Sequence, residues 1–264
     1  MPNIRVGMRF PSALSALLLT LVLAGCMGDD DTTTVTVRET VTETTTGTVP
    51  ETAPAVVKTY FLVDGKVAPL PRPAVAGPAV GRAALEALLA GPGEDRGYET
   101  AIADGTTIRS LSIANGVAAV TTTPLLTTGE QQAQLVYTLT QFPTVKRVSY
   151  NGGRPTGRAG FEAQTPAILV ESPLPGEEVE PGFEVTGTAN TFEATFNYEL
   201  RDSADKVLAK NFVTATSGSG TRGTFRFTIP YEIDKPQNGR LVVFELSAAD
   251  GSRINERSTP LRLG

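Results

Sequence analysis

Beyond residue 55 the hydrophobic positions follow two different periods along the chain. Two segments carry apolar residues at a spacing of three and four, which is the period of an amphipathic helix. The first runs from Val80 to Ala90 and is followed by Gly91 and Pro92, a pair that commonly ends helices. The second begins at a capping-box spacing of Thr128 and Gln131. Two helices are therefore predicted, with apolar stripes of Val80, Ala84, Leu85, Leu88 and Leu89, and of Leu135, Val136 and Leu139.

Alternating apolar and polar residues around these helices predict β-strands. The expected strands cover residues 56–63, 66–70, 107–113, 117–122 and 145–150. Pro69, Pro71 and Pro73 are expected to interrupt pairing of the second strand, and Asn115-Gly116 is a strong hairpin signal. The order β-(β)-α-β-β-α-β predicts an α+β domain over residues 56–152, with two helices on one face of a sheet.

The pattern changes again after a stretch without periodicity, residues 153–165, which we interpret as a linker. Residues 166–264 contain short alternating runs separated by turn residues, and no helix is expected there. This density of strands is typical of an all-β immunoglobulin-like sandwich, here without the cysteine pair and tryptophan of antibody domains. The expected strands lie near residues 167–171, 183–189, 194–200, 207–215, 223–229, 239–246 and 257–263.

The first 25 residues have the features of an export signal. Arg5 and Arg9 precede an uncharged apolar stretch from Ser12 to Gly25, which is too short to span a bilayer but fits a cleavable signal. Leu-Ala-Gly-Cys at residues 23–26 resembles the bacterial lipobox. That resemblance implies cleavage before Cys26 and attachment of lipid, with acyl chains such as palmitate, to its thiol.

Residues 26–55 differ in composition from the rest of the chain. Asp29 to Ala55 contains eleven threonines and no aromatic residue, so it lacks the apolar surface that would offset the entropy of ordering. We expect a disordered tether that separates the folded domains from the membrane.

The composition limits the chemistry. The chain has no histidine, no tryptophan and one cysteine, which excludes catalytic pairs that use histidine, thiolate metal clusters and an intramolecular disulfide. The net charge of −5 becomes −7 after cleavage, because residues 1–25 contain two arginines and no acid. Without a basic cluster, no nucleic acid is expected as a partner. For the same reason, the acyl chains alone must anchor the protein in the membrane. No cofactor and no metal site is predicted.

Three features of the sequence resemble chemical sites. Residues 218–223 fit G-x-G-x-x-G, but an alternating strand follows instead of a helix, which favours a hairpin loop. Residues 203–206 fit S-x-x-K but occupy a turn between two strands. Acidic residues remain as candidates for glycoside hydrolysis or for weak Ca²⁺ binding, although without EF-hand spacing. These are Glu177, Glu178, Glu180, Asp202 and Asp205.

One aromatic residue of the second domain stands apart from the expected core. Phe192, beside Glu193, lies in a short loop between two strands, where an aromatic side chain can anchor a partner. Packing at the end of the sandwich is the alternative for Phe192. Phe192 and Glu193 are the candidate partner-binding residues, and no catalytic residue is assigned.

Several strings resemble known families. TYFLVDG at 59–65, RAALEALLAGP at 82–92 and LVYTLTQFP at 135–143 look like the GerMN domain of sporulation and spore germination proteins. VESPLPG at 170–176, TGTAN at 186–190, RGTF at 222–225, VFE at 243–245 and SAADGS at 247–252 look like the spore germination immunoglobulin-like domain. The resemblance implies cell-surface domains that bind or assemble, similar to ring-building modules, with no catalytic residue to carry over.

These features lead to one hypothesis and two alternatives. We expect a non-enzymatic lipoprotein on the extracytoplasmic face of the cell membrane, whose domains contact an envelope protein or cell-wall polymer. The first alternative is a carboxylate-dependent peptidoglycan hydrolase at the same location. The second is a self-assembling structural module, which makes a homo-oligomer a candidate state.

Overall fold

The computed structural model describes residues 54–264, except residues 76, 78 and 96. All of the described residues belong to one compact unit of the chain. The predicted signal peptide of residues 1–25, the lipidated Cys26 and all but the end of the predicted tether of residues 26–55 lie outside the described residues. No helix among the described residues is long and apolar enough to cross a membrane.

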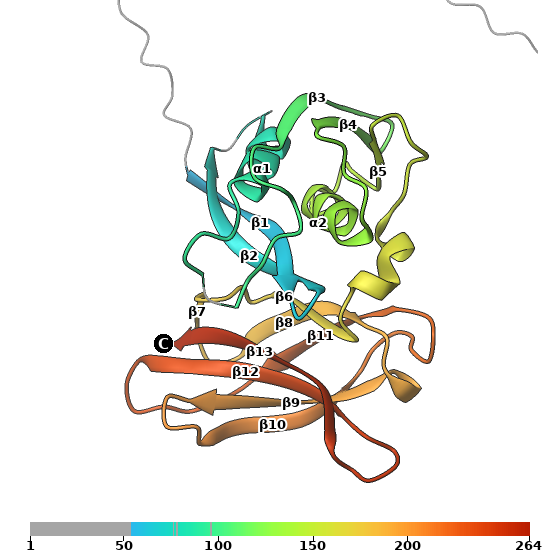
Figure 1. Ribbon diagram of the computed structural model, residues 1–264. Helices are drawn as coiled ribbons and strands as arrows, with labels where there is room; N and C mark the ends of the chain where they lie inside the picture. Colours follow the sequence, from blue (N-terminus) through green and yellow to red (C-terminus); the bar gives the residue numbers. More distant parts are fainter. Residues whose placement is uncertain (1–53, 76, 78, 96) are drawn as a thin grey trace, which may run out of the picture. The chain divides into compact units, whose positions relative to one another are not determined.

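The first part of the structure has the predicted order β-β-α-β-β-α-β (Figure 1). The elements are β1 (Pro54–Val63), β2 (Lys66–Val75), α1 (Val80–Leu89), β3 (Thr107–Ala114), β4 (Val117–Thr123), α2 (Gly129–Leu139) and β5 (Arg147–Tyr150). The strands form two hydrogen-bonded sheets, the hairpin β1-β2 and the sheet β3-β4-β5. Helices α1 and α2 pack against each other and against β1.

Local sequence signals set the ends of these elements. The hydroxyl of Thr128 accepts a hydrogen bond from the Gln131 amide, 3.3 Å, and the Gln131 side chain accepts one from the Thr128 amide, 3.1 Å. This is the predicted capping box at the start of α2. Asn115 and Gly116 have φ angles of 50° and 77°, as a tight hairpin turn between β3 and β4 requires.

The prediction that prolines interrupt the second strand is wrong. β2 runs through Pro69, Pro71 and Pro73 and pairs with β1 along its whole length. Among the described residues, β2 has a strand partner on one side only, and the three prolines occupy alternate positions. A proline is tolerated where its nitrogen faces the unpaired edge of a strand, because no ladder hydrogen bond is lost there.

The second part of the structure is a sandwich of two sheets, in agreement with the predicted class. Its sheets have the strand orders β10-β9-β12-β13-β7 and β11-β8-β6. Seven strands lie where they were predicted, and the two-residue β7 is additional. The elements are β6 (Ile168–Ser172), β7 (Glu178–Val179), β8 (Phe183–Ala189), the 3₁₀ turn η2 (Phe192–Ala194), β9 (Thr195–Asp202), β10 (Val207–Thr214), β11 (Gly223–Ile229), β12 (Gln237–Leu246) and β13 (Arg253–Leu263).

The segment interpreted as a linker is partly ordered. Residues Arg158–Gln164 form the 3₁₀ helix η1, and the side chain of Phe161 is buried in the core of the first domain. Leu169 of β6 joins the same core. Periodicity could not predict this docking, because a single aromatic residue in a Gly- and Arg-containing stretch forms no repeating pattern.

Candidate functional site at the domain junction

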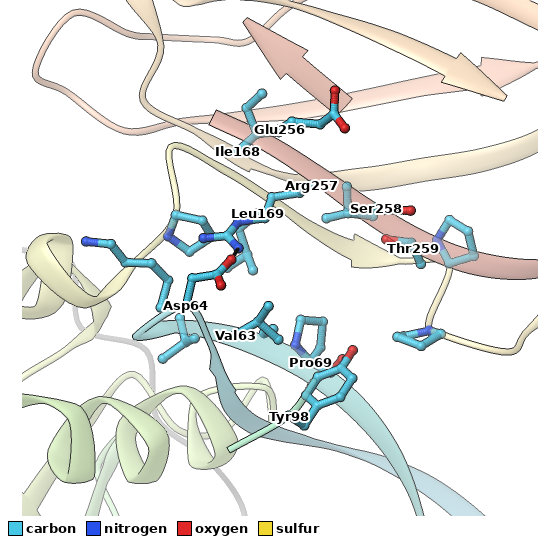
Figure 2. A pocket seen from close by; sticks show the side chains of 17 residues that line it. Val63, Asp64, Pro69, Tyr98, Ile168, Leu169, Glu256, Arg257, Ser258 and Thr259 are labelled. Atoms are coloured by element: carbon cyan, nitrogen blue, oxygen red, sulfur yellow. Dashed lines mark hydrogen bonds and ion pairs between the residues drawn. The ribbon is translucent and has the colours of Figure 1, made fainter. Parts of the chain in front are cut away.

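A cavity of about 250 Å³ lies where the β1–β2 turn meets the sandwich (Figure 2). The first domain contributes the turn, the start of β2 and Tyr98. The second contributes β6, the loop after it, and one stretch of β13. The lining residues are Val63, Asp64, Lys66, Val67, Ala68, Pro69, Tyr98, Pro166, Ile168, Leu169, Val170, Pro173, Pro175, Glu256, Arg257, Ser258 and Thr259.

The walls of this cavity are rigid and largely apolar. Pro69, Pro173 and Pro175 lie among the lining residues, and proline has a fixed φ angle and no free amide hydrogen. Tyr98 lies beside Pro69 in Figure 2, and its hydroxyl donates a hydrogen bond to the Pro69 carbonyl, 3.3 Å. Burial, and then the nearby charge of Asp95, raises the pKa of Tyr98 to about 12. Tyr98 is therefore a neutral wall of the cavity and not an acid–base group.

Each charged group that lines this cavity has a polar partner, and Glu256 forms an ion pair with Arg253, 3.5 Å. Arg257 of β13 and Asp64 of the β1–β2 turn form an ion pair of 2.7 Å, and Figure 2 shows the two side chains facing each other. The ammonium group of Lys66 donates a hydrogen bond to the carbonyl of Ala163, 2.5 Å. The cavity thus offers apolar and hydroxyl contacts, from Ser258 and Thr259 among others, and suits a ligand that inserts an apolar or ring-shaped group.

A half-buried polar network joins the two domains near this cavity, one residue after Val170 of its lining. Glu171 of β6 accepts hydrogen bonds from the Tyr60 hydroxyl, 2.5 Å, and from the guanidinium group of Arg158, 2.7 Å. The guanidinium carbon of Arg158 lies 4.6 Å from the ring centre of Tyr137 and 5.4 Å from that of Tyr60. Arg158 also donates to the Thr140 hydroxyl, 2.7 Å. One arginine in η1 thus contacts the first strand, the second helix and the sandwich.

The electrostatics of this network favour its charged form. Burial by itself would raise the pKa of Glu171, but the positive charge of Arg158 and the two hydrogen bonds hold that pKa below its usual range. Burial, and then the negative charge of Glu171, raises the pKa of Tyr60 well above its usual value. At neutral pH the network therefore contains a carboxylate, a guanidinium ion and neutral phenols. Nothing in it is poised to move a proton.

The predicted partner-binding residues lie away from this cavity, on η2. Phe192 is 66% exposed, and its amide donates a hydrogen bond to the carboxylate of Glu245, 3.0 Å. Glu193 is exposed and has a φ angle of 52°, and its amide donates to the Ser219 hydroxyl, 3.0 Å. This exposure argues against the alternative of a packed Phe192, and a role in binding stays a prediction.

Several of the acidic candidates hold turns and strands in place. A carboxylate oxygen of Glu177 accepts from the Leu174 amide, 2.6 Å. Asp202 caps the β9–β10 turn by accepting from two backbone amides, each at 2.9 Å. Asp205 forms ion pairs with Arg201, 3.0 Å, and with Arg240. In the described part of the chain, no group of three potential ligands is placed to hold a metal ion.

The two short motifs, at residues 203–206 and 218–223, fall in loops. Residues 203–206 form the β9–β10 turn, as predicted. The glycine-rich motif at 218–223 connects β10 to β11, and Gly223 begins β11. The predicted hairpin is wrong in one respect, because β10 and β11 belong to different sheets. With no helix after it, the loop lacks the dipole that would hold a pyrophosphate.

Sequence reasoning missed the residues that form the junction. Arg158 and Glu171 are separated by thirteen positions, and Asp64 and Arg257 by 193, so neither pair follows a local period. One indirect signal existed: Arg158 is a charged residue close to a lone aromatic, Phe161, in a short connection.

Comparison with protein families assigns both domains. Residues 58–150 match a family described as sporulation and spore germination, and residues 167–252 match one described as the immunoglobulin-like domain of bacterial spore germination. No curated protein matches the chain.

Three solved structures illustrate the similarity. The first GerMN domain of the sporulation protein GerM from Bacillus subtilis is 22% identical, with 38% of this chain and 85% of that chain covered and a TM-score of 0.31. The tandem GerMN domains of the same protein are 16% identical, with 68% and 63% covered and a TM-score of 0.31. A putative lipoprotein from Clostridium perfringens is 13% identical, with 43% and 92% covered and a TM-score of 0.28.

Proposed function

This chain belongs to the proteins that join a sporulation and spore germination domain to a spore germination immunoglobulin-like domain, and on that premise we propose that it is a non-catalytic lipoprotein of the cell envelope. It binds an envelope partner on its folded domains while Cys26 holds it to the membrane. The domain boundaries proposed are a signal at 1–25, a tether at 26–55, domains at 56–152 and 166–264, and a connection at 153–165.

The observation that carries the proposal is the junction itself. A preformed cavity with apolar walls lies at the junction, and the charged groups beside it, Asp64 with Arg257 and Arg158 with Glu171, are paired. Such an arrangement favours binding over bond cleavage, since acid–base catalysis needs a group free to exchange protons. The pairing of Arg158 with Glu171 also joins the domains that line the cavity, which favours a preformed binding site.

The membrane part of the proposal is supported by the N-terminal sequence. The lipobox-like residues 23–26 follow a charged n-region and an uncharged apolar stretch. A single acyl chain binds membranes weakly, and a diacylated cysteine provides the second chain that stable anchoring requires. The threonine-rich segment then gives the domains reach from the membrane surface.

Metabolic labelling with a fatty-acid probe tests the anchor. The wild-type chain is expected to take up the label and to sediment with membranes, and the Cys26→Ala variant is expected to do neither. Label that remains on Cys26→Ala would overturn the anchor. Protease added to intact cells should degrade the wild-type domains if they face outward.

Incubation of the chain with peptidoglycan tests the non-catalytic part. We expect no release of reducing sugar. Release that is abolished by Glu178→Gln or Asp205→Asn would support the hydrolase alternative and contradict the proposal.

One observation favours self-assembly as a second function. β3 is at the edge of its sheet, with one side of its backbone unpaired among the described residues. An exposed edge strand can pair with a second copy of the chain. Analytical ultracentrifugation at high concentration tests this, and a strict monomer would count against it.

A further inference from the structure

The sheet β3-β4-β5 has one face without a covering element among the described residues. Ala118, Val120 and Thr122 of β4 are buried toward the helices, so the alternate residues Ala119, Thr121 and Thr123 lie on the opposite face, where they are exposed. The pairing register places small residues of β3 and β5 beside them. We call this the outer face; its centre consists of Ser110, Ser112, Ala119, Thr121, Thr123 and Ser149.

Two arginines mark the ends of the outer face. Arg109 is the extra residue of a β-bulge in β3, and its Nε donates a hydrogen bond to the hydroxyl of Thr123, 3.1 Å. Arg147 begins β5 opposite Val117, at the other end of β4, and alternates with the buried Val148. Val117 and Thr123 are separated along the strand by about 20 Å.

Two further exposed cations lie close to this sheet. Lys146 is exposed next to the β3–β4 turn, where its amide donates to the Gly116 carbonyl, 2.8 Å. Arg154 is exposed in the loop after β5, two residues before Thr156, which bridges back to Val148. Like Arg109 and Arg147, they form no ion pair with any other described residue.

The charge of this region is opposite to that of the whole chain. The chain has a net charge of −5, yet residues 107–123 and 144–157 contain four cations and neither aspartate nor glutamate. The expectation of a chain without a basic cluster is therefore wrong for the folded protein, because the fold gathers cations that are far apart in the sequence. An unpaired cluster of one sign attracts a ligand of the other sign, and the attraction is screened by salt.

We propose that the outer face binds an anionic, phosphate-bearing polymer of the cell envelope. Guanidinium groups pair with phosphate oxygens, and the serine and threonine hydroxyls between them can donate to phosphate or sugar oxygens. Cations at both ends of a strip about 20 Å long suit a ligand with repeated charges better than a single phosphate.

A polymer fits this face better than a bilayer does. Tyr150, the aromatic residue of these three strands, turns away from the outer face and donates a hydrogen bond to Gln132 of α2. Interfacial membrane binding uses large apolar or aromatic side chains that enter the acyl boundary. The centre of the outer face presents only alanine, serine and threonine, and Val117 at its end is half-buried. Its small side chains allow close approach of an extended chain instead.

Binding of the full chain to long-chain inorganic polyphosphate tests the proposal. The test variant changes Arg109, Lys146, Arg147 and Arg154 to glutamine. The control changes Lys206, Lys210, Lys235 and Arg262 to glutamine, which removes the same charge from exposed residues of the sandwich. A third variant changes the three arginines of the face to lysine, so that its charge is kept.

We expect the test variant to bind about tenfold or more weakly at low salt and to show a shallower dependence of affinity on salt, because fewer phosphates are contacted. The control variant should lose much less affinity for polyphosphate, and the lysine variant should retain most of that affinity. Equal losses in test and control variants would overturn the proposal in favour of a general charge effect. Absence of polyphosphate binding by the wild type would also overturn it.

Vesicles of phosphatidylglycerol and phosphatidylcholine separate the polymer from a membrane. Binding of the wild type to these vesicles but not to polyphosphate would assign the face to lipid and contradict the proposal. The choice of an envelope polymer rests on the proposed extracytoplasmic location, whereas polyphosphate binding in solution does not. A failure of the lipid anchor at Cys26 would therefore leave this measurement unchanged.

Discussion

The Glu171 carboxylate is the most informative position for a stability measurement. Glu171 accepts hydrogen bonds from Arg158 and Tyr60, and the side chains of Arg158 and Glu171 are 26% and 16% exposed. Removing one partner of a fully buried ion pair costs about 3–5 kcal/mol. Because both groups retain some contact with water, we expect Glu171→Gln to lower the free energy of unfolding by about 2–3 kcal/mol at pH 7.

The cost of Glu171→Gln should depend on pH in a defined direction. The pKa of Glu171 is lowered in the folded state, so its ionised form contributes stability above the ordinary glutamate pKa of about 4.3. That contribution is lost as the pH falls through the lower, folded-state pKa. Glutamine does not titrate, so the difference between the wild type and the variant should shrink in acid.

Urea denaturation followed by far-UV circular dichroism measures the free energy of unfolding of both proteins at each pH. Circular dichroism is used because the chain has no tryptophan to report by fluorescence. Glu184→Gln is the matched control, because Glu184 pairs with Arg226 on the surface, where both side chains are exposed. Surface pairs of this kind contribute at most about 1 kcal/mol. If Glu171→Gln costs no more than the control, or if its cost is the same at acid and neutral pH, the account of the junction is wrong.

Three other substitutions follow from the structure, and chemical denaturation checks each. Phe161→Ala should cost about 3–5 kcal/mol, because Phe161 fills the core of the first domain; a cost below 1 kcal/mol would mean that η1 is not docked. Thr128→Ala should cost about 1 kcal/mol through the lost cap of α2, with Thr128→Ser close to the wild type; equal losses in both would contradict the capping role. Phe192→Ser should change stability by less than about 0.5 kcal/mol, since the ring is exposed, and a larger loss would make it a packing residue.

Local features of the fold could be predicted from the sequence, whereas features that depend on long-range contacts could not. The helices, the Asn115-Gly116 turn and most strands of the sandwich followed from short-range periodicity and turn chemistry, and the structure confirms them. The full length of β2 did not, because whether prolines interrupt a strand depends on whether its edge has a partner.

The junction could not be predicted for a similar reason. Glu171 and Tyr60 are 111 positions apart, and their contact exists only once both domains are folded. The cavity likewise combines residues of β2 and β13. Phe192, by contrast, lies in a short loop and is exposed, and its role in binding stays a prediction.

A photo-crosslinking experiment in intact cells tests the central claim, that the chain binds an envelope partner at the domain junction. A photoreactive residue replaces Pro175 at the cavity, and a second version replaces Thr228, which is exposed on β11. We expect one discrete crosslinked partner from position 175, absent from position 228. The crosslinked product from position 175 should disappear when Thr259→Trp fills the cavity. It should persist with Thr224→Trp, which adds the same side chain to an exposed strand position. The same products from both positions, or a partner that Thr259→Trp leaves unchanged, would contradict the claim.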